Sequence, residues 1–498
     1  MFYKNKIKEK KTKNEEFLYD LLAKNQKIGK DDSVLDYSMP TLAYNFMSQD
    51  ETLKAGYGFE SLKMPLSVQD TSNESLFVIR GTEVKGLWNV KWFDNVQTFT
   101  DKYFLYYFND ENYVCYNNIL GQRYTVNIIP TNFTQTPVSA YYRQNGFDSL
   151  LLSGAGEGVM VINSNGVQKN QNAPKIISCC THYGKLFAIT ESDRGKLVYA
   201  DETDVLQWTS QGLENIDFGD GRGNLNKIIS FDDYLYLFRD FGITQLSIYG
   251  KDDNFSVSHM YLSDSYIYPN SISQSGDKIY FLTKSGLKVF NGTKVVDVEI
   301  DAIKLANRCD NESCSAVCFE GRYYLACRGD FDDNKSVGCE SYANGYINNM
   351  LLVYDLQSEK VEVVRGVDIH QVLALNNPYK SKLIACFNNE HIGKIGQLSF
   401  DGKIFGSSLP SYISFAKSDF GKANVKKRIK AFLICSQGDC QVKISNENKT
   451  YTFSVSGKNE VQKIRTNIIG KSFSVKIECG GSDTKVSKFI LMVGQEKW

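Results

Sequence analysis

The sequence is poor in histidine, has no net charge and contains no long hydrophobic run. It has 498 residues with 4 histidines, and its 57 Lys and Arg balance its 57 Asp and Glu. Without a basic excess, no global field attracts nucleic acid or anionic lipid. No segment reaches the roughly 20 apolar residues that span a bilayer, so we expect no stable membrane insertion. The start, MFYKNKIKEKKTKNEEF, is too charged for a secretory signal, and we expect assembly in a cytoplasm.

Motifs of catalysis are also missing. The four histidines are scattered, and none stands in a metal-binding or nucleophile motif: His182, His259, His370 and His391. The chain has no Gly-x-Ser-x-Gly elbow, no His-Glu-x-x-His and no Walker sequence. The glycine-rich GDGRG at 219–223 is not followed by a helical pattern, which favours a wide turn over a phosphate site. We therefore predict a protein that is not an enzyme, with no catalytic residue and no cofactor.

Carboxylates are frequent in the expected turns, as at Asp330, Asp332 and Asp333. A calcium loop would need a glycine and a terminal glutamate at set spacings, and both are missing here. A pair of catalytic carboxylates, as in a glycosidase, would leave no such spacing. A propeller can bring acidic residues of several blades together at its axis. The missing motifs thus argue against an enzyme without removing that alternative.

Twelve cysteines are present, and five of them lie close together: Cys309, Cys314, Cys318, Cys327 and Cys339. Their spacing lacks the paired Cys-x2-Cys knuckles of a structural zinc site, so we predict no bound metal. In a reducing cytoplasm we favour small buried apolar side chains over disulfides. Cys435 and Cys440 could face each other across a hairpin, and the same argument applies to them.

Aromatic residues are abundant, with 30 Tyr, 30 Phe and 4 Trp, and this composition favours strands. The strands recur as a unit of a short β-rich run, a tight polar turn and a second β-rich run. Seven copies begin at Lys102, Asp148, Gly184, Asp233, Gly276, Gly321 and Ser381. Most of the intervals between them fit the roughly 40 to 50 residues of a four-stranded propeller blade. Each copy is predicted to be the central hairpin of one blade.

The alternating apolar positions, such as Ile279 and Phe281, cannot be buried on both faces by one small sheet. Neighbouring blades must cover them, and a closed ring does so while leaving only short edges. We predict an all-β protein, with a β-propeller of about seven blades over residues 71–400 and a small β-sandwich after it. The stretch 75–93 is our candidate for the strand that closes the ring.

The two ends of the chain depart from the repeat. Residues 1–70 are interpreted as an N-terminal arm and lead-in segment, either a solvated tail or a short helix. The helix would place Phe17, Leu18, Leu21 and Leu22 on one face.

Residues 401–498 are predicted to form the β-sandwich. Phe473, Val475 and Ile477 alternate as in half-buried strands joined by Asn and Gly turns. The basic cluster there is interpreted as a solvated strand edge protected against pairing, not as a phosphate site. Its members are Lys426, Lys427, Arg428 and Lys430.

Several stretches resemble the β-propeller proteins of bacteriophage tails, the nozzle or stabilization proteins of short-tailed phages. Residues 199–250 carry a Trp turn, a Gly-Asp-Gly loop and a strand pair ending in Tyr-Gly, and 271–298 and 350–364 are similar to later blades. Residues 411–434 resemble the entry to the C-terminal sandwich of these proteins. The resemblance extends from about residue 180 onward, over about two-thirds of the chain, and is one of pattern and residue type.

The resemblance implies a structural protein of the virion tail, forming a ring of identical copies around the channel through which DNA leaves. Its partners would be portal or adaptor proteins and tail fibres, and DNA would be in contact only in transit. The family has no catalytic residues to transfer. The alternatives are a carbohydrate-binding or carbohydrate-active propeller and a host-cell interaction scaffold. No interface residue is assigned, because exposed and buried aromatics look alike at alternating positions.

Overall fold

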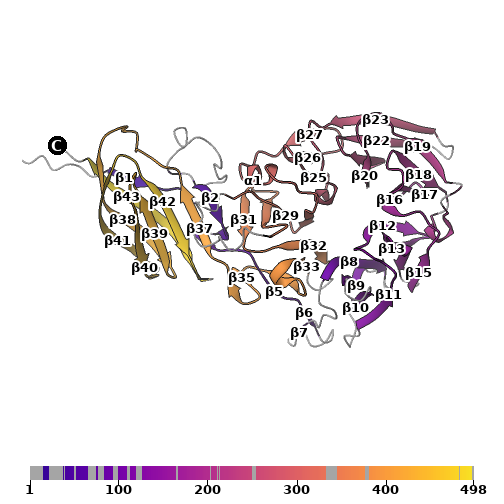
Figure 1. Ribbon diagram of the computed structural model, residues 1–498, viewed down its shortest axis with the longest axis horizontal. Helices are drawn as coiled ribbons and strands as arrows, with labels where there is room; N and C mark the ends of the chain where they lie inside the picture. The colour runs from indigo at the N-terminus through magenta and orange to yellow at the C-terminus, as the bar shows by residue number, and fades with distance from the viewer. Residues whose placement is uncertain are drawn as a thin grey trace, which may run out of the picture. The chain divides into compact units, whose positions relative to one another are not determined.

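The computed structural model of the protein is almost entirely β, with two compact units (Figure 1). It describes residues 15–21, 38, 40–49, 52–65, 74–76, 84–93, 99–108, 113–118, 126–163, 166–201, 203–209, 211, 213–249, 254–331, 345–375, 381–481 and 483–495. The propeller unit contains the described residues of Phe59–Glu359 and Arg365–Ser399. The sandwich unit contains the described residues up to Gly58, Lys360–Val364 and those from Phe400 onward.

Six antiparallel four-stranded sheets follow one another along the chain, and each is one blade. Blade 1 contains β8 (Val84–Phe93), β9 (Phe99–Phe108), β10 (Tyr113–Asn118) and β11 (Val126–Pro130). Blade 2 contains β12 (Val138–Gln144), β13 (Phe147–Gly154), β14 (Gly158–Asn163) and β15 (Gly166–Asn170). Blade 3 contains β16 (Ile176–His182), β17 (Lys185–Thr190), β18 (Lys196–Ala200) and β19 (Glu214–Asp217).

The next three sheets repeat this order. Blade 4 contains β20 (Leu225–Phe231), β21 (Tyr234–Arg239), β22 (Gly242–Tyr249) and β23 (Asn254–Leu262). Blade 5 contains β24 (Ser273–Ser275), β25 (Lys278–Thr283), β26 (Gly286–Phe290) and β27 (Val295–Asp297). Blade 6 contains β28 (Ser315–Phe319), β29 (Arg322–Cys327), β30 (Met350–Asp355) and β31 (Val361–Arg365). The connections include η1 (Val205–Gln207), η2 (Pro269–Ser271) and the short helix α1 (Ile303–Asn307).

The seventh blade joins the two ends of the circuit. Its strands β32 (Ile369–Leu375), β33 (Lys382–Phe387) and β34 (Ile395–Ser399) come from late in the chain, with η4 (Asn389–His391) between the last two. The strand beyond β34 is β5 (Gly58–Ser61), which precedes the propeller in sequence. The prediction that 75–93 closes the ring is therefore wrong. Within that stretch β7 (Glu74–Leu76) pairs with β6 (Lys63–Pro65), and β8 is the innermost strand of blade 1.

The predicted hairpins are confirmed as the second and third strands of each blade. The second strand is apolar on both faces, because a neighbouring blade covers each side of the sheet. In β17, β25 and β33, for example, five or more consecutive residues are buried. Cores between blades collect these residues, as where Phe187 and Ile189 pack with Leu235 and Leu237. Stacking of blades thus supplies the burial that one isolated sheet lacks.

The sandwich unit is built from both ends of the chain. One sheet has the order β3-β4-β43-β38-β41, with β1 also paired to β43, and the other has the order β2-β37-β42-β39-β40. Early strands are β1 (Glu15–Leu18), β2 (Pro40–Tyr44), β3 (Phe46–Gln49) and β4 (Thr52–Ala55). Late strands are β37 (Ser411–Phe415), β38 (Lys427–Gln437), β39 (Cys440–Ser445), β40 (Thr450–Val455), β41 (Val461–Gly470), β42 (Ser474–Cys479) and β43 (Lys485–Gln495), preceded by the short pair β35 (Lys403–Ile404) and β36 (Ser407–Ser408).

The interpretation of residues 1–70 as a separate arm or helix is wrong for the described part. Phe17 and Leu18 lie in strand β1, and Leu22 is outside the described residues. Tyr19 and Leu21 are buried in the sandwich core, where Tyr19 makes edge-on ring contacts with Phe415 and Phe489. The same apolar residues are compatible with a helix or a strand. Packing against the sandwich core stabilises the strand.

The alternation predicted near residue 475 is confirmed, since Val475 and Ile477 point into the sandwich core from β42. The basic cluster is different from the expectation. It begins β38, which lies between β43 and β41 and is not an edge. Lys427 is buried, and its Nζ donates to the carbonyl oxygens of Lys422, Val425 and Lys471. Burial lowers its pKa. This lysine closes a loop and is not solvated.

Candidate functional site

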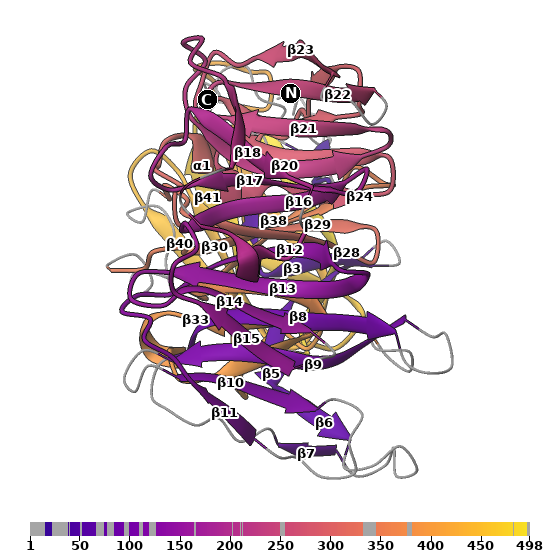
Figure 2. The same ribbon diagram turned by 90° about the vertical axis from the view of Figure 1, so that its right-hand side faces the viewer.

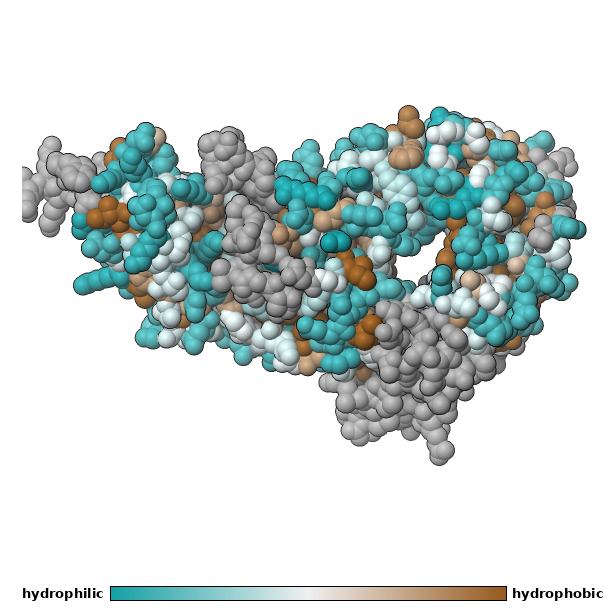
Figure 3. Space-filling model, viewed as in Figure 1, coloured by the Kyte–Doolittle hydropathy of each residue, from teal (hydrophilic) through white to brown (hydrophobic). Residues whose placement is uncertain are grey.

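The strands nearest the propeller axis carry no carboxylate. They are β8, β12, β16, β20, β24, β28 and β32, the first strand of each blade, and none of their residues is Asp or Glu. Their charged residues are Lys85, Lys91, Arg143 and Lys227. Figure 3 shows an opening through the centre of the propeller. An acid pair of the glycosidase kind is therefore not supplied by the strands around this opening.

Each innermost strand has one unpaired backbone edge within its own sheet, and polar side chains of the neighbouring blade bind to it. At three junctions a serine hydroxyl of one innermost strand accepts a hydrogen bond from a backbone N–H of the next blade's innermost strand. The pairs are Ser178 with Ile228 (3.0 Å), Ser273 with Cys318 (2.9 Å) and Ser315 with Val372 (3.1 Å). These contacts satisfy buried donors that would otherwise cost free energy. They also remove part of the sheet edge that could pair with another chain.

At three other junctions, threonine, glutamine and lysine side chains make hydrogen bonds with the backbone of the neighbouring blade. Thr181 Oγ1 accepts from the N–H of Arg143 (3.0 Å) and donates to its carbonyl (2.9 Å). Gln371 makes the same pair of contacts with Leu87, at 2.8 and 2.7 Å. Lys227 Nζ donates to the carbonyl of Ile272 (2.8 Å), and burial lowers the pKa of this ammonium to about 8. Hydrogen bonds between neighbouring blades therefore surround the axis.

Replacing Ser178 by alanine tests these junctions. The N–H of Ile228 would lose its buried acceptor, which costs about 1–3 kcal/mol. We expect a lower thermal unfolding temperature and faster hydrogen exchange in the peptide that contains β20. Ser256→Ala, on the exposed strand β23, is the control and should change neither. Unchanged exchange at β20 in the Ser178 variant would show that the hydroxyl contributes nothing.

The GDGRG segment is a turn fastened by a buried arginine. Arg239, 1% exposed, donates through Nη2 to the carbonyls of Phe218 (2.7 Å) and Gly223 (2.8 Å). Its Nη1 lies 2.6 Å from Asp220 Oδ1. The strand β20 follows, so no helix N-terminus faces the loop, and the wide turn expected here is confirmed. A Cβ at Gly223 would lie 2.5 Å from the Cβ of Asp240, so the turn needs glycine there.

The histidines stay apart in the structure. His259 Nδ1 lies 3.3 Å from Thr244 Oγ1, and its Nε2 lies 3.2 Å from Arg222 Nη1. His182 Nδ1 lies 3.0 Å from Ser230 Oγ across the junction of blades 3 and 4. Burial lowers the pKa of His182 and of His391. Among the described residues no three His, Cys, Asp or Glu side chains gather as a metal site.

The cysteines of the cluster are free thiols where they are described. Cys318 lies in β28 and Cys327 in β29, as expected, and Cys314 and Cys327 are buried. Burial raises the pKa of Cys314 to about 12, so this thiol stays protonated. Cys339 lies outside the described residues, as do Asp332 and Asp333.

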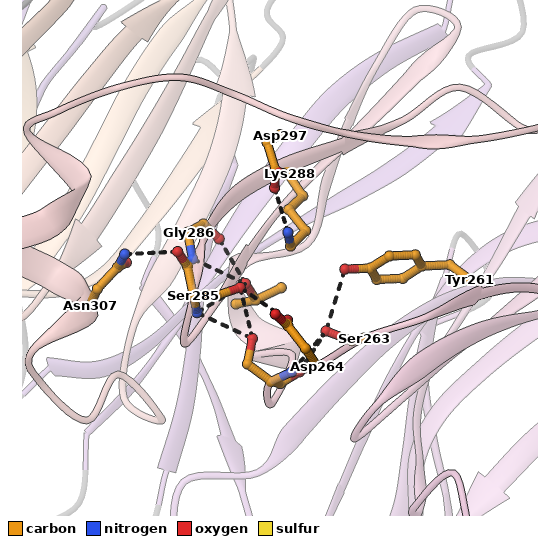
Figure 4. A network of polar contacts seen from close by, with 10 residues as sticks. Tyr261, Ser263, Asp264, Ser285, Gly286, Lys288, Asp297 and Asn307 are labelled. Carbon is orange, nitrogen blue, oxygen red and sulfur yellow. Dashed lines mark hydrogen bonds and ion pairs between the residues drawn. The ribbon is translucent and has the colours of Figure 1, made fainter.

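A network of hydroxyls joins blades 4 and 5 (Figure 4). Ser285 Oγ lies 2.9 Å from Ser265 Oγ and 3.0 Å from Thr283 Oγ1, and it donates to Asp264 (3.3 Å). The carbonyl of Ser285 accepts from Asn307 Nδ2 (2.9 Å). These partners of Ser285 are hydroxyl, carboxylate and amide groups, and we interpret the network as a link between the β25–β26 turn and the connection after β23.

One outer strand differs from the rest. β23 has 9 residues, whereas the last strands of blades 1, 2, 3, 5 and 6 have 3 to 5. It carries no Asp, Glu, Lys, Arg or Pro, and it forms the edge of its sheet at the top of Figure 2. Val257 is 41% and Leu262 68% exposed. A long neutral edge with apolar side chains is prone to pair with another chain.

No protein-family model matches the chain, and no curated protein matches it. Similar solved structures include the WD40 domain of Neurospora crassa Pan2, at 10% identity and TM-score 0.38, covering 64% of this chain and 89% of that one. A second is a catalytically inactive virginiamycin B lyase from Staphylococcus aureus, at 9% and 0.42, covering 69% and 99%. A third is the extracellular domain of a hybrid two-component system from B. thetaiotaomicron, at 9% and 0.42, covering 88% and 62%. These similarities are too slight to bear on function.

None of the helices among the described residues has the length and apolarity that a membrane crossing requires.

Two sites missed by the sequence analysis are the axial junctions and the β23 edge. The first leaves no signal until the blades are aligned. The second could have been found, because its run of nine residues without charge or proline is visible in the sequence.

Proposed function

We propose that this protein is a structural component of a bacteriophage tail, one of several copies in a nozzle or neck ring around the DNA exit channel. The resemblance of residues 199–250 and 411–434 to tail propeller proteins suggests the setting. The observation that supports a structural role is the β23 edge, because a long neutral strand edge with exposed apolar side chains favours pairing with another copy. The proposed neighbours are portal or adaptor proteins and tail fibres.

The chemistry of the axis favours this proposal over a carbohydrate-active propeller. Glycoside hydrolysis uses two carboxyl groups on opposite sides of the scissile bond. The seven innermost strands supply none, and several of their polar side chains bind the neighbouring blade, among them Ser178 and Gln371. A duplex in transit would pass through the ring of copies, whose balanced charge avoids the retention that a basic channel would cause.

The mass of the purified protein in solution, alone and mixed with virions or tail components of the same source, tests the proposal. A defined ring, or incorporation into particles, would support it. A monomer that ignores those components and binds or cleaves a glycan would overturn it in favour of the carbohydrate alternative.

The contribution of β23 to the ring can be measured separately by Val257→Lys. A lysine on an exposed edge opposes strand pairing, so we expect the ring to dissociate while the thermal unfolding temperature stays unchanged. The matched control is Val167→Lys on β15, an outer strand of 5 residues that already carries a lysine. A ring of unchanged mass in the Val257 variant would exclude β23 as the contact.

A further inference from the structure

Two cysteines face each other on the last rung of one sandwich sheet. Cys440 is the first residue of β39 and Cys479 the last of β42, and the two are directly opposed in antiparallel register. Both are free thiols, 4% and 2% exposed. Directly opposed residues have Cα atoms about 4.5–5.5 Å apart. That separation falls within the 4.4–6.8 Å that a disulfide requires.

The sequence alone allows a different pair, Cys435 and Cys440. Cys435 lies on β38, in the other sheet, opposite Val461 and Lys488. It therefore does not face Cys440 across a hairpin. The residue that does face Cys440 is 39 positions later in the chain, as the register of β39 and β42 shows.

The two thiols are chemically unequal. A hydrogen bond from Cys479, helped by Ser436, lowers the pKa of Cys440 against the effect of burial. The same contact, together with burial, raises the pKa of Cys479. Because the thiolate is the nucleophile, Cys440 is the sulfur that reacts first.

The position at the end of the sheet gives access. The surrounding connections contain Gly438, which has φ +78°, and Gly457, Gly480 and Gly481. Gly480 and Gly481 are exposed and directly follow Cys479. A terminal rung flanked by glycines opens at less cost than the middle of a sheet, so a small reagent can reach a pair that is buried on average.

We propose that Cys440 and Cys479 form a disulfide site, a dithiol in reducing surroundings that closes on exposure to a small disulfide oxidant. The Cys440 thiolate attacks one sulfur of the oxidant, forms a mixed disulfide and releases one thiolate. Cys479, deprotonated on opening, then attacks the Cys440 sulfur and releases the second thiolate. The protein loses two electrons and two protons, and the oxidant becomes two thiols. The proposal concerns the sandwich alone and does not depend on the function proposed above.

The test is incubation of the full-length protein with oxidised glutathione, followed by alkylation of the remaining thiols and peptide mapping. We expect the linked peptide of Cys440 and Cys479 before any other, with the loss of two hydrogens. We also expect a higher thermal unfolding temperature, which dithiothreitol reverses. Cys435→Ser is the matched control and should keep both effects.

Cys440→Ser and Cys479→Ser should abolish the linked peptide and the thermal shift. Mapping of the unaltered protein decides the matter even where a variant fails to fold. A stable mixed disulfide on Cys440 without closure, or oxidation of other cysteines while these two remain alkylatable, would overturn the proposal.

Discussion

Phe59→Ala is expected to open the propeller ring and to destabilise the protein by about 3–5 kcal/mol, the usual cost of truncating a buried phenylalanine. Phe59 is fully buried in β5, and its ring packs edge-on against Phe387 with centroids 5.3 Å apart. β5 is held beside β34, where the N–H of Leu62 donates to the carbonyl of Ile395 (3.1 Å). Loss of the ring therefore weakens the contact that joins the ends of the circuit.

The measurement is thermal or denaturant unfolding, together with hydrogen exchange of the peptides that contain β5 and β34. We expect these peptides to exchange faster than those of blade 3, because the substitution removes packing between β5 and the rest of the seventh blade. Phe147→Ala, at a ring that is 42% exposed, is the control and should cost far less. Equal effects of the two substitutions would show that β5 does not close the ring.

Arg239→Met is expected to destabilise the protein by about 1–3 kcal/mol for each buried carbonyl that loses its donor. Asp220 is 32% exposed and keeps its contact with Arg222, so most of the loss comes from backbone carbonyls that lose their donor. Here the affected groups are the carboxylate of Asp220 and the carbonyls of Phe218 and Gly223. Arg239→Lys keeps the charge but not the fork that reaches all three, so it should recover only part of the stability.

Arg222→Met is the matched control, because Arg222 binds the same carboxylate at 2.8 Å but is 27% exposed. We expect it to cost less than about 1 kcal/mol, as exposed pairs do. A loss in the Arg239 variant no larger than in the Arg222 variant would show that the turn does not depend on the buried guanidinium.

The pH dependence of these variants has a definite sign. Burial opposes ionisation of Asp220, but hydrogen bonds from Arg222 and Arg239 outweigh it and hold the pKa of this carboxyl below its usual value. Its contribution to stability is therefore present at neutral pH and is lost as the pH falls through the folded-state pKa. The difference in stability between the native protein and Arg239→Met should shrink in acid.

Two local patterns in this sequence fit more than one structural environment. The charge of residues 426–430 predicts a solvated strand edge, yet Lys427 is buried and its Nζ has three carbonyl partners. Phe17 and Leu18 fit one face of a helix, but in the structure they lie in strand β1, which pairs with β43. In both cases the local pattern is compatible with an exposed and a packed environment. Contacts with a distant part of the chain determine which of the two is formed.

By itself, the sequence determined the all-β class and the hairpins of the blades, because alternation of apolar residues and turn chemistry are properties of neighbouring residues. How those hairpins are joined became visible only in the folded chain. Three features depend on contacts between segments that are apart in the sequence. They are the placement of β5 beside β34, the hydrogen bonds of Arg239 to its turn, and the register that opposes Cys440 and Cys479. Such contacts follow from packing and strand order, and spacing along the chain carries no trace of them.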